Sequence, residues 1–397
     1  MLSKKKALIL SYSRFPKGDA GAIRQETFAK MLNDMGYSVF VLGMGQFTGE
    51  NAVNCEEYSY SSLRNKENDF YSKMNNFFGY AKKLGTFLSK TPKWDLLFVV
   101  DLPIKAMNTA YNYSKKNNCD LICDRVEWYS SSEFKLRWLS PEYFRTDLKN
   151  RYYFTNNWKI VGISSFLTSY FEKRGLNALR IPVILDTDTY PYDKKCNSNK
   201  TVIIYAGVPS RKDCFDQVVK AVDMVEKAQK LEIRIIGVTE SQFISSMSIS
   251  QEDWSRWKNV IHCLGRLPHD EVLNQYREAD YSILIRHSEQ RYAKAGFPTK
   301  VPESLATGTP VICNLSSDLA YYLHDGRNSV IVDEDTPERI AEAINRAMSY
   351  SEVEKCLMRE NARKTAINSF DYRRYIERMK AFLEDGANKD EGRNDTV

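Results

Sequence analysis

The sequence predicts an α/β protein in which two Rossmann-like domains, each built on a parallel sheet, face each other across a cleft. Short β-branched or apolar runs alternate with helix-length amphipathic segments, which is typical of parallel sheets covered by helices on both faces. The alternation forms two series, separated by a polar stretch at 181–200. The length of 397 residues suffices for two or three domains of about 100–200 residues each.

The first series predicts an amino-terminal domain over residues 1–182. A helix-like segment from Ala22 to Met35, closed by Gly36, follows its first strand-like run. A helix at about 370–385 is expected to pack back on this domain. The strand-like runs are Ala7–Leu10, Val39–Leu42, Leu96–Val100, Leu121–Cys123 and Ile160–Ile163.

The second series predicts a domain over residues 201–369, after a hinge at 183–200 rich in Pro, Asp, Asn, Ser and Lys. Its intervening helices include Cys214–Lys227 and His269–Glu278. The end of the chain, 386–397, has little to bury and is expected to be a disordered tail. The strand-like runs are Val202–Tyr205, Ile233–Ile236, Val260–Cys263, Tyr281–Ile285, Val311–Cys313 and Ser329–Val332.

Composition excludes several classes of protein. With 57 Lys and Arg against 51 Asp and Glu, the net charge is +6, which is too mild to indicate nucleic acid but permits contact with an anionic acceptor or membrane surface. No apolar run approaches the roughly 18 residues of a spanning helix, and the start of the chain does not read as a signal peptide. The eight Cys are mostly far apart, so we expect free thiols in the cytoplasm.

The most informative segment runs from Ala295 to Pro310. A Gly- and Pro-rich loop leads into a short helix that starts near Val301 and Pro302 and ends at Gly308. A helix start at the carboxyl end of a sheet presents free N–H groups, which suits a diphosphate. Glu303 in the first turn can accept two hydrogen bonds from a ribose diol. The alternative is a capped helix in which Glu303 only complements the helix dipole.

At these residues the sequence resembles the retaining GT-B glycosyltransferases of the large glycosyl transferases group 1 family. In that family a Glu-x7-Glu element precedes a small residue, Gly and Pro-Val-Ile. Other landmarks follow the family's order and cover about residues 200–345. They are Tyr205-Ala-Gly207 with Arg211-Lys212, His262-Cys-Leu-Gly265, Ala279-Asp280-Tyr-Ser-Ile-Leu-Ile and Asp325-Gly326-Arg-Asn328-Ser.

The resemblance implies that Glu303 holds the nucleotide ribose. The first Glu of the element, which in the family lies against the donor sugar, falls on Ala295. In our interpretation the backbone of the following loop holds the sugar, with help from Arg286 or His287, while Lys300 keeps the phosphate-facing part intact. The loop residues in this role are Gly296, Phe297, Pro298 and Thr299.

The resemblance also assigns the diphosphate to the segment Gly207-Val-Pro-Ser-Arg211-Lys212. There an Arg/Lys pair neutralises charge that grows on the leaving nucleotide, a catalytic role for Arg211 and Lys212. Val208 occupies the usual Arg position, so Arg211 is expected to supply the guanidinium. Adjacent Arg and Lys are also common on solvated helix starts, which is the alternative for this pair.

The acceptor side is expected in the amino-terminal domain. Gly21 precedes its first long helix, where backbone N–H groups approach the cleft in the family. Asp124 and Glu127 follow a strand end, and either carboxylate is a candidate to orient an acceptor hydroxyl as a catalytic group. The alternative is a pair of loop carboxylates in ion pairs with Arg125.

Three further signals favour ordinary structural roles. Asp186-Thr-Asp188 matches a metal-binding D-x-D but lies in the hinge, where a turn is expected. Cys119 and Cys123 are expected to be core thiols. Residues 135–160 are aromatic and carry six basic against two acidic residues, which favours a basic helical excursion over a sugar- or membrane-binding surface.

The resulting hypothesis is a glycosyltransferase that moves a sugar from a nucleotide diphosphate donor to a glycan or lipid-linked acceptor, in polysaccharide biosynthesis, with retention of configuration. The resemblance implies no metal and no other cofactor, because the departing phosphate can help to deprotonate the acceptor. Contact with an anionic membrane at its inner face is a further expectation. Two alternatives stay open: an accessory subunit with a decayed site, motivated by Ala295 and Val208, and a sugar-nucleotide epimerase.

Overall fold

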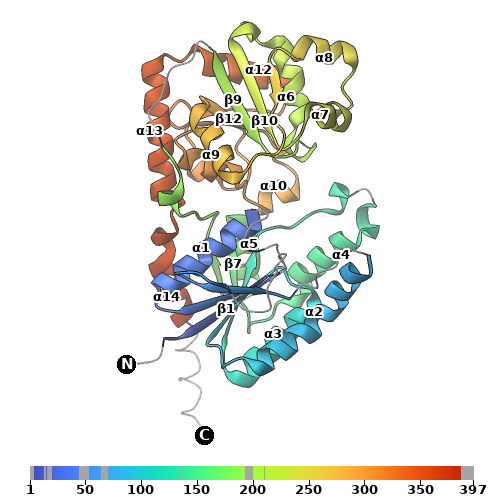
Figure 1. Cartoon of the computed structure of the whole chain (residues 1–397), viewed down its shortest axis with the longest axis vertical. Helices are drawn as coiled ribbons and strands as arrows, with labels where there is room; N and C mark the ends of the chain where they lie inside the picture. The colour runs from blue at the N-terminus through green and yellow to red at the C-terminus, as the bar shows by residue number, and fades with distance from the viewer. Residues whose placement is uncertain are drawn as a thin grey trace. The chain divides into compact units, whose positions relative to one another are not determined.

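The computed structural model describes residues 4–12, 15, 20–43, 53–63, 70–134, 136–192, 200–209 and 211–385. The chain forms two compact units (Figure 1). Unit 1 extends to Leu185 and resumes at Tyr372, so that the carboxyl-terminal helix belongs to it. Unit 2 runs from Asp186 to Asp371.

Unit 1 is built on a sheet that has eight strands among the described residues, in the order β3-β4-β2-β1-β5-β6-β7-β8. Neighbouring strands are parallel except for β3 and β4, which are antiparallel at one edge. The five predicted strands are confirmed. The strands are β1 (Lys6–Ser11), β2 (Ser38–Gly43), β3 (Val53–Asn54), β4 (Ser59–Ser62), β5 (Leu96–Val100), β6 (Asp120–Arg125), β7 (Lys159–Gly162) and β8 (Ala178–Arg180).

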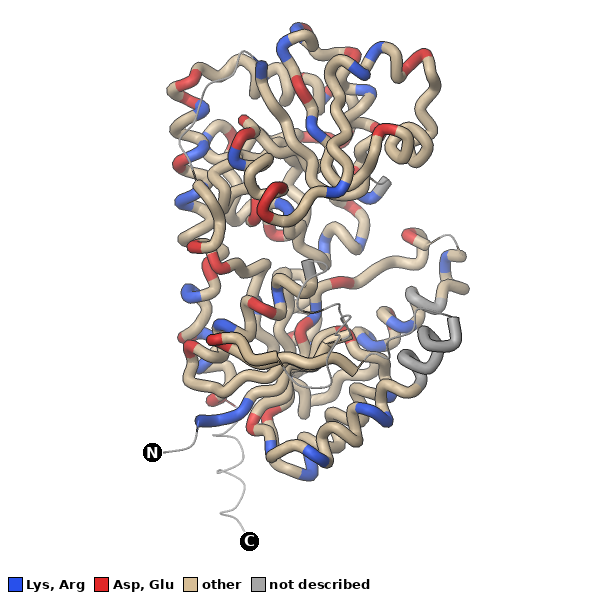
Figure 2. The backbone as a smooth tube through the Cα atoms, viewed as in Figure 1, with Lys and Arg blue, Asp and Glu red and all other residues tan. Residues whose placement is uncertain are grey.

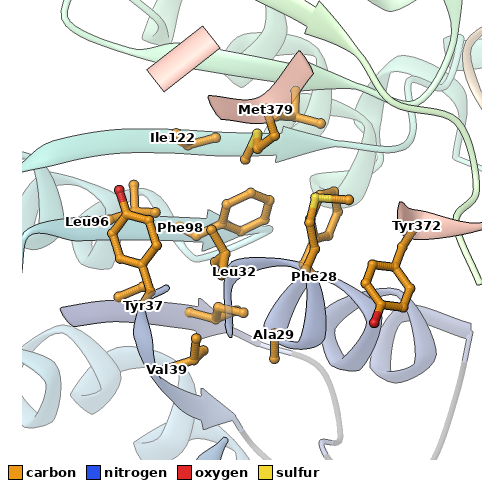
Figure 3. Close-up of a cluster of buried hydrophobic side chains, with 14 of the residues drawn as sticks. Phe28, Ala29, Leu32, Tyr37, Val39, Leu96, Phe98, Ile122, Tyr372 and Met379 are labelled. Carbon is orange, nitrogen blue, oxygen red and sulfur yellow. The ribbon is translucent and has the colours of Figure 1, made fainter. Parts of the chain in front are cut away.

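The helices of unit 1 cover the sheet because alternate strand residues face opposite sides. Leu96 and Phe98 of β5 share one core with Phe28 and Leu32, which lie one helical turn apart on α1 (Figure 3). The Phe28 and Phe98 rings are 4.6 Å apart between centroids. Met379 of α14 completes this face, while α2 and α3 lie side by side (Figure 1). The helices are α1 (Ala20–Asp34), α2 (Phe70–Lys90), α3 (Ile104–Asn117), α4 (Pro141–Leu148), α5 (Ser165–Lys173) and α14 (Ile376–Glu384).

Unit 2 has a parallel sheet in the order β11-β10-β9-β12-β13-β14 among the described residues. Its first strand, β9, lies in the interior, so the chain leaves toward one edge through β10 and toward the other through β12. This reversal is the topological switch point at which ligands bind in open α/β sheets. The strands are β9 (Thr201–Ala206), β10 (Leu231–Ile236), β11 (Ile261–Cys263), β12 (Tyr281–Leu284), β13 (Val311–Cys313) and β14 (Ser329–Ile331).

The helices of unit 2 confirm the predicted helix at His269–Glu278 and shorten the one predicted at Cys214–Lys227. The α-helix ends at Ala221 and tightens into a 3₁₀ turn at Val222–Met224, beyond which Glu226 donates its N–H to Asn345 Oδ1 at 3.2 Å. The helices are α6 (Phe215–Ala221), α7 (Glu240–Met247), α8 (Gln251–Trp257), α9 (His269–Glu278), α10 (Arg291–Ala295), α11 (Lys300–Ala306), α12 (Pro337–Ser349) and α13 (Glu352–Ser369).

The cysteines correct one expectation. Burial raises the pKa of the Cys119 and Cys123 thiols to about 12, in agreement with core thiols. Cys356 is disulfide-bonded, so the expectation of free thiols throughout is wrong, and Cys196 lies outside the described residues. The free thiols of the described residues are Cys55, Cys119, Cys123, Cys214, Cys263 and Cys313.

Basic and acidic residues are interspersed along the backbone of both units (Figure 2). Among the described helices, none combines the length and the apolar character that crossing a membrane requires.

Candidate functional site

The candidate site lies at the carboxyl ends of β9 and β12, on either side of the switch point of unit 2. Gly207 directly follows β9, and Arg286 comes two residues after the end of β12. Asn314, which follows β13, fixes the backbone of Arg286: its side chain accepts from the Arg286 N–H at 2.9 Å and donates to the Arg286 carbonyl at 2.5 Å. The sheet therefore sets the position from which the guanidinium extends.

Gly207 is required by a close approach of Lys300. A Cβ at position 207 would lie 2.7 Å from Lys300 Nζ and 2.9 Å from its Cε, and the φ of +142° also favours glycine. On its other side, a Cβ on Gly237 would lie 2.9 Å from the Gly207 carbonyl carbon and oxygen. Two elements that the sequence assigns to the donor, the end of β9 and the start of α11, thus meet at one point.

Lys300 is held there by a polar cluster. Its Nζ donates to Tyr205 Oη at 2.8 Å and to Asp213 Oδ2 at 3.0 Å, and Tyr205 donates to the same Asp213 oxygen at 2.5 Å. Arg286 Nε lies 3.4 Å from Asp213 Oδ1 without alignment for a hydrogen bond. Two cations thus share one carboxylate, which leaves positive charge for an anionic ligand.

The pKa values of this cluster follow from burial and charge. Burial acts to raise the pKa of Asp213, but Lys300 and Arg286 outweigh it, so the pKa is lowered and the carboxylate stays ionised. Burial lowers the pKa of Lys300, and Asp213 opposes that shift. Burial and Asp213 both raise the pKa of Tyr205, which keeps its phenol as a donor.

Tyr205 and Asp213 were missed as site residues by sequence reasoning. Tyr205 ends the apolar run of β9, and Asp213 directly follows the Arg211-Lys212 pair. A carboxylate next to two cations was the signal that could have identified Asp213 as their anchor.

Glu303 lies one helical turn after Lys300 on α11 and is partly buried. Within the described part of the chain its carboxylate has no hydrogen-bond or ion-pair partner. Burial raises its pKa to about 7, and the charge of Lys300 opposes the shift only in part. A carboxylate kept unpartnered in a dehydrated place is suited to accept hydrogen bonds from a ligand.

In the loop between α10 and α11, which the sequence assigned to sugar binding, several groups are engaged in packing and capping. Gly296 caps α10 by donating its N–H to the Tyr292 carbonyl at 2.9 Å, so that donor is already engaged. The Phe297 ring is buried against Phe370, and Pro298 is buried too. Thr299 precedes α11 and makes no side-chain cap. The first turn of α11 offers few free donors either, because Val301 donates its N–H to the Pro298 carbonyl at 3.1 Å, Glu303 donates to the Thr299 carbonyl at 3.4 Å, and Pro302 has no N–H.

Ala295, where the family has a Glu, is fully buried at the end of α10. A Glu side chain there would place a carboxylate in the core, so an Ala295→Glu substitution would test folding before it tested sugar binding.

Arg211 and Lys212 form the 3₁₀ turn η5 (Arg211–Asp213) together with the anchor Asp213. The Arg211 side chain lies outside the described part of the structure. Lys212 Nζ lies 4.9 Å from the centre of the Tyr292 ring, and Tyr292 donates its hydroxyl to the Lys212 carbonyl at 2.6 Å. Both contacts attach Lys212 to α10, the helix that precedes the loop leading to Lys300.

One group of three potential metal ligands occurs among the described residues. Cys214, His287 and Asp335 bring their ligand atoms within 4.8 Å of one another. Asp335 Oδ2 is 2.5 Å from His287 Nδ1 and accepts from the Cys214 thiol at 3.7 Å, and these contacts explain the group without an ion. Asp186 and Asp188 do not join such a group; they flank and enter the 3₁₀ turn η4 (Thr187–Thr189).

Asp124 in unit 1 is engaged in a buried bidentate ion pair. Arg24 of α1 donates to both of its oxygens at 2.8 Å and to the Pro182 carbonyl at 2.5 Å. The partner is therefore Arg24, not the neighbouring Arg125, and the carboxylate is not free to orient an acceptor hydroxyl. We assign Asp124 the structural role of tying α1 to β6.

Glu127 and Gly21 occupy different surroundings. Glu127 is exposed in the loop after β6, and among the described residues no partner binds its carboxylate. Gly21 lies within the first turn of α1, because that helix begins at Ala20 instead of after Gly21. Its N–H is one of the free donors at the helix start.

Comparison with protein families gives one match: residues 186–366 match the family described as Glycosyl transferases group 1. This match covers unit 2 almost entirely. No curated protein matches the chain.

The chain is similar over nearly its whole length to several solved structures, including the following three. The sucrose-phosphate synthase of Thermosynechococcus elongatus is 11% identical with a TM-score of 0.73, over 97% of this chain and 100% of that one. HepE of Anabaena, in complex with UDP and glucose, is 13% identical with a TM-score of 0.66, over 96% and 100%. The trehalose 6-phosphate synthase of Burkholderia multivorans is 10% identical with a TM-score of 0.67, over 100% and 99%. These likenesses show the GT-B fold.

Proposed function

Because residues 186–366 match the family described as Glycosyl transferases group 1 and the chain has the GT-B fold, we propose that it transfers a sugar from a nucleotide diphosphate donor to a glycan or lipid-linked acceptor with retention of configuration. Unit 2 binds the donor and unit 1 the acceptor. The observation that carries the proposal is the meeting of Gly207 with Lys300 at the switch point, one turn from the unpartnered carboxylate of Glu303. HepE, of the same fold, binds UDP and glucose, which supports a uridine nucleotide as the first donor to test.

In this proposal the charged side chains of the site divide into those that meet the diphosphate and one that binds the ribose. Lys300 Nζ, Arg286, Arg211 and Lys212 meet the diphosphate, whose charge increases as the sugar leaves. The Glu303 carboxylate accepts from the ribose diol. The leaving phosphate takes the acceptor proton on the same face, so no protein base is required.

Calorimetric titration with UDP, UDP-sugars and other nucleoside diphosphates tests the donor site. A ligand at 100 times its dissociation constant also stabilises the fold by about 2.7 kcal/mol, which a thermal shift detects. NMR of the product anomer tests retention. A protein that binds no nucleotide under either method would contradict the proposal.

A second candidate is an accessory subunit with a decayed site, favoured by the absence of a sugar-facing Glu at the buried Ala295 and by the exposed Val208. Such a protein would bind nucleotide sugars but release no nucleoside diphosphate. Assays of both binding and turnover over the same donor panel separate the two candidates.

We expect turnover to survive EDTA, because Lys300, Arg286 and Lys212 meet the diphosphate charge in place of a divalent ion. The measurement is initial rate before and after dialysis against EDTA. Loss of activity with rescue by manganese would return Asp186 and Asp188 as ligands, whereas rescue by zinc would implicate Cys214, His287 and Asp335.

Lys212→Ala is expected to lower kcat more than it raises KM for the donor, since the charge it meets grows toward the transition state. The exposed Lys220 on α6 offers a matched control as Lys220→Ala, for which we expect no change. A change in KM alone for Lys212→Ala would mean uniform donor binding instead.

Membrane contact at an anionic inner face is part of the proposal for unit 1. Large apolar side chains of one segment are exposed between basic residues, which is the pattern of an interfacial surface. Co-sedimentation with anionic but not with neutral vesicles tests it. The exposed side chains are Leu136, Trp138, Leu139, Phe144, Leu148 and Tyr152.

A further inference from the structure

Unit 1 has a switch point of its own, where Asp101 follows β5. Strands β1 and β5 are neighbours in the sheet, and the chain extends from them toward opposite edges through β2 and β6. Ligands of open α/β sheets bind outside the carboxyl ends of strands at this place. Asp101 has a φ of +39°, uncommon for a residue other than glycine and typical of positions under functional constraint.

Three cations surround the Asp101 carboxylate. Lys149 Nζ is 2.9 Å and Arg125 Nη1 3.8 Å from Oδ1, and Arg145 Nη2 is 3.6 Å from Oδ2. Burial acts to raise the pKa of Asp101, but Lys149, Arg125 and Arg145 together lower it to about 2. The carboxylate is thus ionised at any physiological pH, and its single negative charge neutralises one of the three positive charges.

The excess of positive charge is not cancelled elsewhere in the described part of unit 1. Arg125, Arg145 and Lys149 form no other ion pair there, so the Asp101 cluster (Asp101, Arg125, Arg145 and Lys149) carries three positive charges against one negative. The Arg125 and Lys149 side chains are only 4% and 1% exposed, and although Lys149 also donates to the Leu102 carbonyl at 2.8 Å, the two buried cations share one carboxylate. Asn150, fully buried, accepts from Arg125 Nε at 3.0 Å and leaves its own Nδ2 without an acceptor.

The cluster remains accessible to a ligand. The Asp101 side chain is 48% exposed and that of Arg145 32%, so solvent reaches the carboxylate and the outermost guanidinium. The Arg145 guanidinium is the donor open to a ligand, and the net charge of +2 with two further cations behind the carboxylate matches a phosphate monoester dianion better than a single carboxylate.

We infer that the Asp101 cluster binds a phosphate group of the acceptor. Assignment of that phosphate to the acceptor rests on the proposed function, whereas the phosphate site itself does not. The phosphate belongs to a soluble sugar phosphate or to a lipid-linked phosphate; both present the same dianion to these residues.

Titration with inorganic phosphate against chloride at equal ionic strength tests the site by thermal shift. We expect phosphate to stabilise the wild type, and Arg145→Gln to weaken its binding about tenfold through loss of a charged hydrogen bond. Asp101→Asn should strengthen it about tenfold, because the competing carboxylate is removed. A purely structural role of Asp101 predicts lower stability with no gain in phosphate affinity.

Arg151→Gln is the matched control, since Arg151 follows on the same segment but pairs with Asp147 at 2.8 Å. We expect it to leave phosphate binding unchanged. The experiment is repeated in the Lys300→Met background, which weakens the donor site, and phosphate stabilisation that is undiminished there but lowered by Arg145→Gln is assigned to the Asp101 cluster. If UDP does not bind, the proposed function fails, but the phosphate titration still tests the Asp101 cluster by itself.

A hexose 6-phosphate and phosphatidylcholine vesicles with or without phosphatidate then distinguish the two sources. Binding of the hexose phosphate that is weakened by Arg145→Gln assigns a soluble acceptor, and binding only to phosphatidate vesicles assigns a lipid-linked one. No phosphate effect in the wild type, equal losses in Arg145→Gln and Arg151→Gln, or weaker phosphate binding by a folded Asp101→Asn variant would overturn the inference.

Discussion

Replacing Lys300 by Met is expected to lower kcat/KM for the sugar donor by about 10²–10³, the effect of removing one preorganised donor from developing negative charge. Lys300 Nζ adjoins Gly207 at the end of β9, and hydrogen bonds to Tyr205 and Asp213 hold it there. Met is one atom shorter than Lys but keeps an unbranched chain without charge, and Arg286 still faces Asp213, so that carboxylate is not left without a cation. The loss should therefore appear in catalysis and UDP affinity before it appears in folding.

The control for this substitution is Lys294→Met. Lys294 lies on α10 of the same unit, but its ammonium is exposed and pairs with Glu289 at 2.9 Å. Steady-state kinetics and UDP titration are measured for both variants, with thermal unfolding to establish that each is folded. A folded Lys300→Met protein with the kinetics of Lys294→Met would remove Lys300 from the donor site.

The fold was predictable where the sequence carries a strong local signal. Helix α9 has the predicted bounds because its apolar positions recur at helical spacing and acidic residues occupy its first turn. The strands of both sheets are short apolar runs between polar loops, which a sequence displays directly. By contrast, the edge strands β3 and β8 and the strand β4 next to β3 are short and contain no fully buried residue, so no apolar run marked them.

The sequence identified many residues of the site, but it did not show which of them contact one another. Gly207 and Lys300 belong to segments far apart in sequence, and only the strand order brings them together. The same holds for Asp124, whose position at a strand end was apparent while its partner Arg24, 100 residues earlier, was not. Sequence neighbours such as Arg125 suggest ion pairs that tertiary packing then assigns differently.

Glu303→Gln is expected to weaken binding of a UDP-sugar at pH 8 by about 1.5–3 kcal/mol, because an amide accepts weaker hydrogen bonds from the ribose diol than a carboxylate does. The pKa of Glu303, raised by burial to about 7, makes this contribution depend on pH. Between pH 6 and 8 the carboxyl group ionises, so wild-type affinity should increase with pH, and the Gln variant should show no such increase. A UDP-sugar is the correct ligand, because its diphosphate is esterified at both ends and does not titrate in this range.

The same pKa fixes the sign of an effect on stability in the absence of ligand. The pKa of Glu303 is higher in the folded protein than the ordinary value of 4.5, so protonation favours the folded state, and this contribution is fully present below pH 4.5 and lost as the pH rises through 7. Glu303→Gln, which cannot ionise, should therefore gain stability relative to the wild type as the pH increases from 5 to 8, by about 1–3 kcal/mol. A variant that binds donor more weakly yet unfolds at a higher temperature at pH 8 would place Glu303 in the site as a group held at a cost in stability for its ligand. Parallel pH profiles of affinity and melting temperature in both proteins would instead return Glu303 to the role of a helix residue without contact to the nucleotide.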